Sequence, residues 1–397
     1  MPRLRFPGFE GEWENMRWGN LGLFFGGLTG KTKDDFGVGG SYFIPYMNVY
    51  KNIIADNKML EPVNIRKEEK QNVVKYGDIL LTQSSETIEE IGLASVWIDN
   101  NEPYLNSFCF AFRLNKEGMS PIWFSYLMRS YNVRKLIMRE GQGITRVNLS
   151  SERLKSVILK IPSLEEQEKI ASTLSLLDSR IAAQRKLVEL LKKHKRGLIK
   201  HLFRPIEHTK WKSVRLGDVG TFQKGAPLSK ADISKDGKPF ILYGELYTTY
   251  GEIIKDVVRR TTAEIDISYL SRCGDVIIPT SGETAEEIAT ASCVMSDGVV
   301  LGGDLNIYRS EHIDGRFLAY AVRYIISRDI SRIAQGVSVV HISATELKRI
   351  SVSIPSKDEQ IRIISVLENY DNRILHSYDI LKKLEVTKDG LLQQLFV

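Results

Sequence analysis

The chain has 397 residues, of which 43% are hydrophobic and 26% charged, a composition typical of a globular protein large enough for two or more domains. Its 55 Lys and Arg against 49 Asp and Glu leave a net charge of +6, which suits an acidic partner and excludes a histone-like basic coat. The 3 cysteines are too few for a disulfide framework and too widely spaced for a zinc site, and no apolar run approaches the ~18 residues of a membrane span. We therefore expect a cytoplasmic protein with no membrane partner and no bound metal.

The first motif in chain order is GGLTGKT at residues 26–32, which has the lysine and threonine of a phosphate-binding loop. That loop needs a glycine five residues before Gly30, where this chain has Phe25. The segment KDDFGVGG that follows is polar and glycine-rich, where a phosphate-binding loop needs a helix. We favour a surface loop here, and a nucleotide hydrolase that uses Lys31 remains an alternative.

The organisation of the chain follows from an internal repeat. IPSLEEQEKI at 161–170 matches IPSKDEQIRI at 354–363, an offset of 193 residues (354 − 161). Four further pairs keep the same order, so one half is a unit of about 195 residues, with a globular part followed by a segment of about 40 residues. These pairs are WENMRWGNLG with WKSVRLGDVG, GDILLTQSSETIEEI with GDVIIPTSGETAEEI, GQGITRVNLSSERLK with AQGVSVVHISATELK, and LIKHLF with LLQQLF.

Each globular part mixes short β-rich runs, such as DILLTQ and DVIIPTS, with helical stretches near 121–140 and 315–333. We predict an α+β fold in which two repeated globular parts are separated by two long antiparallel coiled-coil helices. The chain has no amino-methylation tetrapeptide, no dinucleotide glycine fingerprint, no His-Glu-x-x-His and no nucleophile elbow. We therefore expect no catalysis by this chain.

The two segments of about 40 residues have the heptad pattern of a coiled coil, with apolar positions at alternating steps of four and three. At 1.5 Å per residue each would form a rod of roughly 60 Å, which suits a spacer with one globular part at each end. Packing into an ordinary core is the alternative. The predicted seam residues are Ile170, Leu174, Leu177, Ile181, Val188, Leu191, Leu198 and Leu202, then Ile363, Leu367, Tyr370, Ile374, Leu381, Leu384, Leu391 and Leu395.

Polar residues interrupt both seams at equivalent places, Gln184 and Lys195 in the first and Ser377 and Lys388 in the second, and such residues commonly set register. The basic run KKHKRGLIKHLFR ends the first segment, where its charge complements the helix dipole, or alternatively contacts phosphates. A capping box is predicted at the start of each helix, formed by Ser163 with Glu166 and by Ser356 with Glu359.

Polar side chains follow equivalent apolar strands in the two halves, and their hydroxyl and amide groups suit both bases and phosphates. Closure of turns and capping of helices is the competing interpretation for any single one of them. The loops diverge at Arg146 and Asn148 against Val339 and His341, which indicates two different targets. The DNA-binding candidates are Lys31, Lys33, Tyr46, Asn48, Gln83, Ser84, Ser85, Thr87, Arg146 and Asn148 in the first half, and Lys224, Lys230, Tyr243, Tyr247, Thr280, Ser281, Thr284 and His341 in the second.

The pair IPSLEEQEKIASTLSLLDSRI and IPSKDEQIRIISVLENYDNRI resembles the two helical regions of the specificity subunit of type I restriction-modification systems, and GDILLTQSSETIEEIG resembles a stretch of its recognition domains. The resemblance covers essentially the whole chain. It implies target recognition domains at 1–160 and 206–353 that each read half of a bipartite double-stranded DNA site, and spacer helices at 161–205 and 354–397.

The same resemblance implies that the spacer helices dock two modification subunits, which methylate adenine, and the restriction and translocase subunits. It implies no cofactor bound by this chain, with S-adenosylmethionine held by the modification subunits and ATP and Mg by the restriction subunits. A coiled-coil scaffold whose globular ends bind other proteins remains the alternative from a different functional class.

Overall fold

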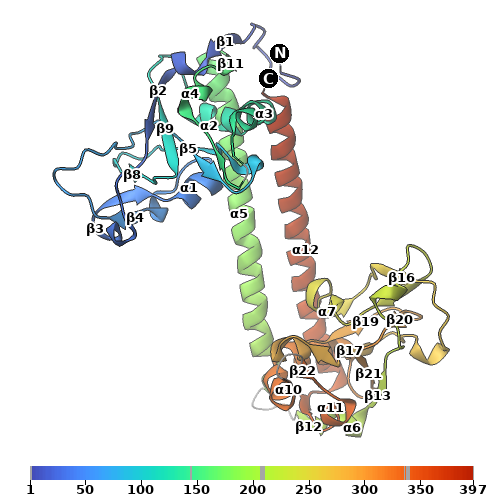
Figure 1. Ribbon diagram of the computed structural model, residues 1–397. Helices are drawn as coiled ribbons and strands as arrows, with labels where there is room; N and C mark the ends of the chain where they lie inside the picture. Colours follow the sequence, from blue (N-terminus) through green and yellow to red (C-terminus); the bar gives the residue numbers. More distant parts are fainter. Residues whose placement is uncertain (1, 144, 206–210, 335, 337–339, 397) are drawn as a thin grey trace. The chain divides into compact units, whose positions relative to one another are not determined.

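The computed structural model describes residues 2–143, 145–205, 211–334, 336 and 340–396 (Figure 1). The chain divides into two compact units. Unit 1 comprises Met1–Arg185 and Asp379–Val397, and unit 2 is the continuous segment Lys186–Tyr378. Unit 1 therefore combines the first globular part with the C-terminal end of the chain.

Unit 1 contains a four-stranded antiparallel sheet in the order β2-β9-β5-β7 and a three-stranded sheet in the order β4-β3-β8. In the smaller sheet β3 is antiparallel to β4 and parallel to β8. The ladders β1–β11 and β6–β10 complete the unit. The strands are β1 (Glu14–Arg17), β2 (Gly22–Gly26), β3 (Phe36–Ile44), β4 (Glu61–Val63), β5 (Ile79–Thr82), β6 (Ser84–Ser85), β7 (Ala94–Val96), β8 (Tyr104–Leu105), β9 (Cys109–Leu114), β10 (Val147–Asn148) and β11 (Ile158–Ile161).

Helix α2 (Pro121–Arg129) covers the four-stranded sheet of unit 1. Pro121 occupies its first turn, and the Ser120 hydroxyl accepts a hydrogen bond from the Trp123 amide, so the helix start is well defined. Its Trp123 and Phe124 are buried in the same core as Trp18 and Phe112. The other helices of the globular part are α1 (Tyr46–Lys51), α3 (Tyr131–Glu140) and α4 (Ser151–Leu154).

Unit 2 repeats this plan, with sheets in the orders β13-β21-β17-β19-β15 and β16-β14-β20 and the ladders β12–β23 and β18–β22. Strand β14 is antiparallel to β16 and parallel to β20, as β3 is to β4 and β8. The strands are β12 (Lys212–Arg215), β13 (Thr221–Lys224), β14 (Lys238–Ile241), β15 (Ile253–Ile254), β16 (Arg259–Thr261), β17 (Asp275–Pro279), β18 (Ser281–Gly282), β19 (Ser292–Val294), β20 (Val300–Leu301), β21 (Leu305–Arg309), β22 (Val340–His341) and β23 (Ser351–Ile354). The helices are α6 (Leu216–Val219), α7 (Glu245–Thr248), α8 (Ala285–Ile288), α9 (Gly315–Tyr324), α10 (Ser327–Ile333) and α11 (Ala344–Leu347).

The two long predicted helices are present as α5 (Leu164–Leu202) and α12 (Lys357–Gln394). All sixteen predicted seam residues are buried or half-buried. The seam is not a coiled coil along its whole length, because its ends pack into the globular cores. Ile170, Leu174 and Leu395 join the core of unit 1, and Ile363 and Leu367 join that of unit 2. The ordinary-core interpretation is therefore right at the helix ends.

Contacts between α5 and α12 inside each unit have antiparallel order. In unit 1, Asp178 pairs with Lys388 at 2.5 Å, and Arg185 further along α5 pairs with Glu385, which is earlier in α12. In unit 2, the Lys192 ammonium lies 4.9 Å from the ring centre of Tyr378, and Lys195 pairs with Asp371 at 2.5 Å. Both predicted seam lysines are thus used in ion pairs. Among the described residues, no helix is long and apolar enough to cross a membrane.

The predicted capping boxes are half formed. The Ser163 and Ser356 hydroxyls accept hydrogen bonds from the Glu166 and Glu359 amides at 3.4 and 3.3 Å. The two carboxylates do not return to the serine amides: Glu166 accepts two bonds of 2.7 Å from Arg5, and Glu359 accepts one of 3.3 Å from the Trp211 indole. Each glutamate therefore attaches the segment before β1 or β12 to a long helix.

Ser163→Ala and Ser356→Ala are each expected to lower the free energy of unfolding by about 1 kcal/mol, because a helix amide loses its acceptor. Urea unfolding followed by circular dichroism measures this. Ser172→Ala is the control, since the exposed Ser172 hydroxyl bonds only the Lys169 carbonyl inside the helix. A loss of the same size in the control would contradict the capping role.

Candidate nucleic-acid interface

Two short ladders bring the predicted polar loops together. In unit 1, β6 pairs with β10 so that Ser84 lies opposite Asn148 and Ser85 opposite Val147. In unit 2, β18 pairs with β22 in the same register, and Ser281 lies opposite His341. The Ser281 hydroxyl oxygen is 3.0 Å from the His341 Nδ1. Candidates separated by about 60 residues in sequence thus become neighbours.

A tyrosine anchors each ladder. The Tyr46 hydroxyl at the start of α1 donates to the Ser84 carbonyl at 2.9 Å, and the Tyr247 hydroxyl of α7 donates to the Ser281 carbonyl at 2.7 Å. Burial raises the pKa of Tyr46 to about 12 and raises the pKa of Tyr247 as well. Both phenols therefore remain protonated hydrogen-bond donors at neutral pH. Tyr50 and Tyr243 complete the two tyrosine pairs, with ring centres 6.1 and 6.2 Å from those of their neighbours.

The ladder and the tyrosines of unit 1 border a hollow of about 400 Å³. Four predicted residues line it together with Tyr50, and four further residues supply carboxylates and apolar surface. Phe108 and Met47 are 54% and 42% exposed, large values for apolar side chains. The predicted members are Tyr46, Ser84, Ser85 and Arg146, and the others are Tyr50, Met47, Glu86, Glu90 and Phe108.

The remaining candidates vary in exposure. In unit 2, Thr280 is half-buried, and its hydroxyl donates to the Asp304 carboxylate at 3.3 Å. Val339 lies outside the described residues. The predicted residues with exposed surfaces are Lys33, Gln83, Thr87, Arg146, Asn148, Lys224, Lys230, Thr284 and His341.

Four candidates have structural partners instead of free polar ends. Asn48 is fully buried, donates to the Asp56 carbonyl and accepts from the Asp56 amide, both at 2.8 Å. The Ser85 hydroxyl closes a turn on the Thr87 carbonyl at 2.6 Å, and the Thr284 hydroxyl caps α8. Lys31 forms an ion pair with Glu69 and donates to the Asn64 carbonyl at 2.6 Å. For these four residues, a structural role such as turn closure or helix capping explains the side chain better than DNA contact does.

The surroundings of Lys31 also differ from a phosphate-binding loop. Thr32 caps a single 3₁₀ turn, Lys33–Asp35, through a reciprocal bond with Asp35, and strand β3 begins at the next residue. A phosphate-binding loop would have the first turn of a helix there. The lysine is also committed to Glu69, whose pKa the Lys31 ammonium holds below its usual value.

Four arginines that sequence reasoning missed have structural partners, and two of them hold the backbone beside the polar ladders. Arg129 donates to the Ala94, Val49, Tyr50 and Asn52 carbonyls over 2.6–3.1 Å, and its counterpart Arg323 bonds the equivalent loop of unit 2. Arg113 and Arg309 pair in the same way with Asp78 and Asp275. The internal repeat carried the signal, because each of these residues is identical in both halves.

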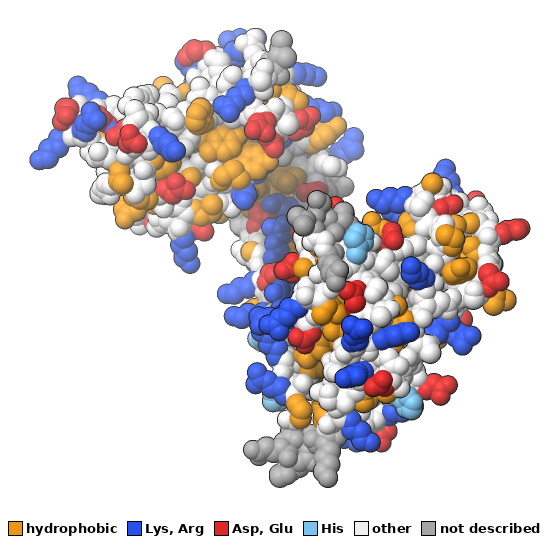
Figure 2. All heavy atoms as spheres, turned by 60° about the horizontal axis from the view of Figure 1, so that its bottom comes forward, with side chains coloured by type: hydrophobic (Ala, Val, Ile, Leu, Met, Phe, Trp, Pro, Cys, Tyr) orange, Lys and Arg blue, Asp and Glu red, His pale blue; other side chains and the backbone are white. Residues whose placement is uncertain are grey.

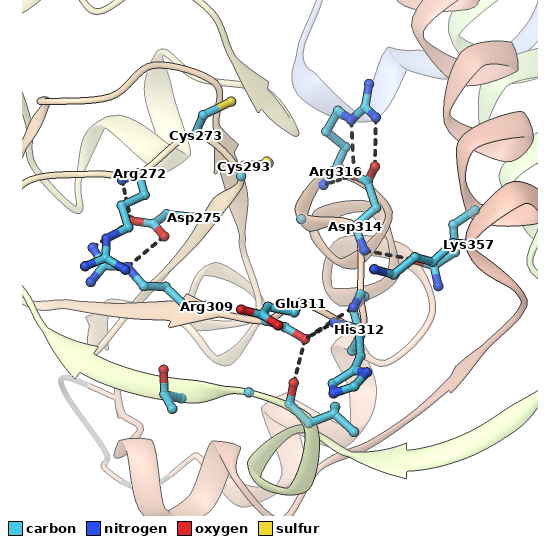
Figure 3. Close-up of a pocket in the computed structure, with 18 of the residues that line it drawn as sticks. Arg272, Cys273, Asp275, Cys293, Arg309, Glu311, His312, Asp314, Arg316 and Lys357 are labelled. Atoms are coloured by element: carbon cyan, nitrogen blue, oxygen red, sulfur yellow. Dashed lines mark hydrogen bonds and ion pairs between the residues drawn. The ribbon is translucent and has the colours of Figure 1, made fainter.

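Unit 2 also has a larger hollow of about 870 Å³, away from its polar ladder (Figure 3). Two of its arginines point toward carboxylates: Arg309 pairs with Asp275 at 2.9 Å, and Arg316 pairs with Asp314 at 2.7 Å (Figure 3). Burial alone would raise the pKa of Asp314, but the bond and the charge of Arg316 hold it below its usual value. Because no predicted residue lines this hollow, the smaller one is the better candidate.

The surface charge is mixed. On the face turned to the viewer, Lys and Arg side chains are interspersed with Asp and Glu (Figure 2). Two lysines of the predicted basic run have carboxylate partners, Lys192 with Glu189 and Lys195 with Glu252 and Asp371. At least these two lysines of the run therefore have a structural role. This favours the helix-dipole interpretation of the run over a phosphate-binding stripe.

A family model described as the type I restriction modification DNA specificity domain matches residues 10–193 and again 208–386. Among curated proteins, the chain is 26% identical over 375 residues to the putative type I restriction enzyme MjaX specificity subunit of Methanocaldococcus jannaschii, covering 88% of this chain and 84% of that one. It is 24% identical over 399 residues to the MjaVIII specificity subunit of the same organism, covering 94% and 89%.

Solved structures share the fold. The type I restriction-modification S subunit from M. genitalium matches with a TM-score of 0.60 at 16% identity, covering 100% of this chain and 99% of that one. The HsdS subunit from Thermoanaerobacter tengcongensis matches with a TM-score of 0.50, also at 16% identity, covering 99% and 98%. Because the family model matches twice and accounts for most of the sequence, the chain belongs to the type I restriction-modification DNA specificity family.

Proposed function

We propose that this chain is the non-catalytic subunit that gives a type I restriction-modification complex its sequence specificity, with each recognition domain reading one half of a bipartite DNA site. The observation that carries this proposal is one scaffold with two different polar ladders. Ser84 faces Asn148 in unit 1, whereas Ser281 faces His341 in unit 2. Two domains with the same backbone scaffold but different side chains at the ladder can read two different base sequences.

The finer assignment gives the recognition domains residues 1–160 and 206–353 and the spacer helices 161–205 and 354–397. In this proposal α5 and α12 set the gap between half-sites and dock two modification subunits and the restriction subunits. S-adenosylmethionine, ATP and Mg belong to those partners. Exposed apolar side chains on the helices, such as Leu176, Leu187 and Leu375, support docking, since they are 73%, 43% and 62% exposed. A structure of similar fold comes from work on complex assembly of the type I R-M system.

The test is single-molecule methylome sequencing of the host with and without the gene. We expect one bipartite motif with adenine methylation in both halves to vanish on deletion. Purified chain should then bind a duplex carrying that motif, with an affinity that falls steeply as salt is raised, because Lys and Arg release counterions from phosphates. Binding without preference among duplexes at every salt concentration would favour a protein-binding scaffold and overturn the proposal.

A further inference from the structure

Two opposite charges line the hollow of unit 1 beside its ladder. The register pairs Ser84 with Asn148 and Ser85 with Val147, and Glu86 and Arg146 are the next residues beyond the last of these pairs. Both side chains line the hollow, and both residues are exposed. No ion pair joins them among the described residues, so the carboxylate and the guanidinium are both available to a ligand.

The charge of the hollow selects a base edge over a phosphate. Two carboxylates, Glu86 and Glu90, line it beside one arginine. Glu90 already accepts a hydrogen bond of 2.8 Å from the Tyr50 hydroxyl, and this bond raises the pKa of Tyr50. A phosphate would be repelled by the two carboxylates, whereas an exocyclic amino group would donate to them.

The remaining wall is apolar. Phe108 is 54% exposed and Met47 42% exposed, and both line the hollow with the ring of Tyr46. Flat and flexible apolar side chains contact the faces and methyl groups of bases without competing for their polar edges. The hollow therefore offers one bidentate donor, one free carboxylate acceptor and an apolar surface within one ladder.

We propose that this hollow reads a G·C base pair in the major groove of the first half-site, with the Arg146 guanidinium on the guanine O6 and N7 and the Glu86 carboxylate on the cytosine amino group. This inference rests on the proposed function and adds the identity of one base pair. Arginine to guanine is the commonest specific contact in DNA recognition, and glutamate accepts from the cytosine N4.

The repeat supplies an internal comparison. In the second half, Val339 stands where the first has Arg146, although the glutamate is retained as Glu283. Val339 lies outside the described residues, so only its identity is used. Arg146→Val therefore gives the first loop the residue of the second, and the second recognition domain serves as an unchanged reference in every assay.

The experiment uses the purified full-length chain and the duplex motif found by methylome sequencing, with each base pair replaced in turn. Wild-type protein should lose about fivefold to hundredfold in affinity when one G·C pair of the first half-site is replaced, or when its guanine becomes 7-deazaguanine, which lacks the N7 acceptor. In Arg146→Val that loss should disappear, while the losses at all positions of the second half-site stay as in wild type. Glu86→Gln should reduce discrimination at the same pair.

Arg146→Lys separates a base contact from a phosphate contact, because lysine keeps the charge but lacks the two-pronged donor. The proposal requires the 7-deazaguanine effect to be smaller in Arg146→Lys than in wild type, because an ammonium can contact guanine but lacks the planar fork. Arg139→Val, on the exposed side of α3, is the control and should leave the pattern unchanged. If Arg146→Val weakens all duplexes equally, or changes nothing, the proposal is overturned. If wild-type protein prefers no duplex, the proposed function itself fails, and the two failures are thus distinguishable.

Discussion

Lys195→Met is expected to destabilise unit 2 by about 3–5 kcal/mol, because it leaves the buried Glu252 carboxylate and the half-buried Asp371 carboxylate without their cation. The Lys195 ammonium lies 3.1 Å from Glu252 and 2.5 Å from Asp371, and the lysine side chain is 9% exposed. Tyr324 donates to Glu252 at 2.6 Å, and Tyr320 donates to Asp371. Methionine preserves the apolar length of the side chain, so the loss reports on the charge.

The loss should also depend on pH. Burial alone would raise the pKa of Glu252, but the Lys195 charge and the Tyr324 bond hold it below its usual value. Without Lys195, burial prevails and the folded-state pKa rises above the unfolded value. The folded state then binds more protons, so the stability of the variant falls as pH rises through that window. Urea unfolding at pH 5 and pH 8, with hydrogen exchange to resolve unit 2, measures the difference.

Lys388→Met is the matched control for this prediction. It removes the equivalent seam lysine of unit 1, which has one carboxylate partner among the described residues, Asp178, with a side chain 29% exposed. We expect a smaller loss with a weaker pH dependence. Glu252→Gln added to Lys195→Met should recover part of the stability, because it removes one unpaired charge. Equal losses at pH 5 and pH 8 in Lys195→Met would show that charge burial is not the cause.

Arg129→Met and Arg323→Met are expected to lower the free energy of unfolding of their own units by about 3–5 kcal/mol, since each leaves several carbonyls unsatisfied at about 1–3 kcal/mol apiece. Arg129 bonds four carbonyls, including those of Val49 and Tyr50 in α1. Arg323 bonds the Ala291, Leu246, Tyr250 and Gly251 carbonyls.

The arginine variants should also weaken DNA recognition in one half only. Arg129 holds the α1 segment that carries the two tyrosines of the unit 1 hollow, so its loss should reduce discrimination at the first half-site. Arg129→Lys should recover little, because one ammonium cannot span the same carbonyls. Arg139→Met, at an exposed position, should change stability by less than about 0.5 kcal/mol. Unfolding assays on the four variants test the expected losses of stability, and duplex competition assays test the expected loss of DNA recognition. Unchanged discrimination at the first half-site in Arg129→Met would contradict the role of Arg129 in recognition.

Periodic features of this chain were predictable because local spacing determines them. The alternating spacing of apolar residues from Ile170 and from Ile363 predicted which face of each long helix is buried. Ser163 and Ser356 predicted where the two helices start. The repeat also identified the loops that meet at Ser84 and Asn148, since equivalent loops occur in both halves. The two similar helical regions predicted the family, and the two matches of the family model confirm this prediction.

Partners distant in sequence were not predictable in this way. Lys31 reads as an exposed cation, yet it pairs with Glu69, which lies beyond β3 and β4. Asn48 offers an amide among aromatic neighbours in the sequence, but the turn at Asp56 folds back over it and both of its polar ends bond the Asp56 backbone. Both outcomes depend on how strands pair, which the spacing of polar residues does not encode. The structural role of Arg129 and Arg323 was predictable, because identical residues at equivalent positions of a repeat indicate the same role in both halves.

The discontinuity of unit 1 has a consequence for the order in which the protein forms during synthesis. Phe396 stacks near Trp123 with ring centres 6.1 Å apart, and Leu395 is buried in the same core. Unit 2 is continuous and is fully translated before those residues appear. At about 5–20 residues per second, the first globular part waits roughly 10–40 s for the residues that complete its core. During that interval the apolar surface around Trp123 lacks the cover of Leu395 and Phe396. We therefore expect chaperones to bind the first globular part mainly before synthesis of the chain ends.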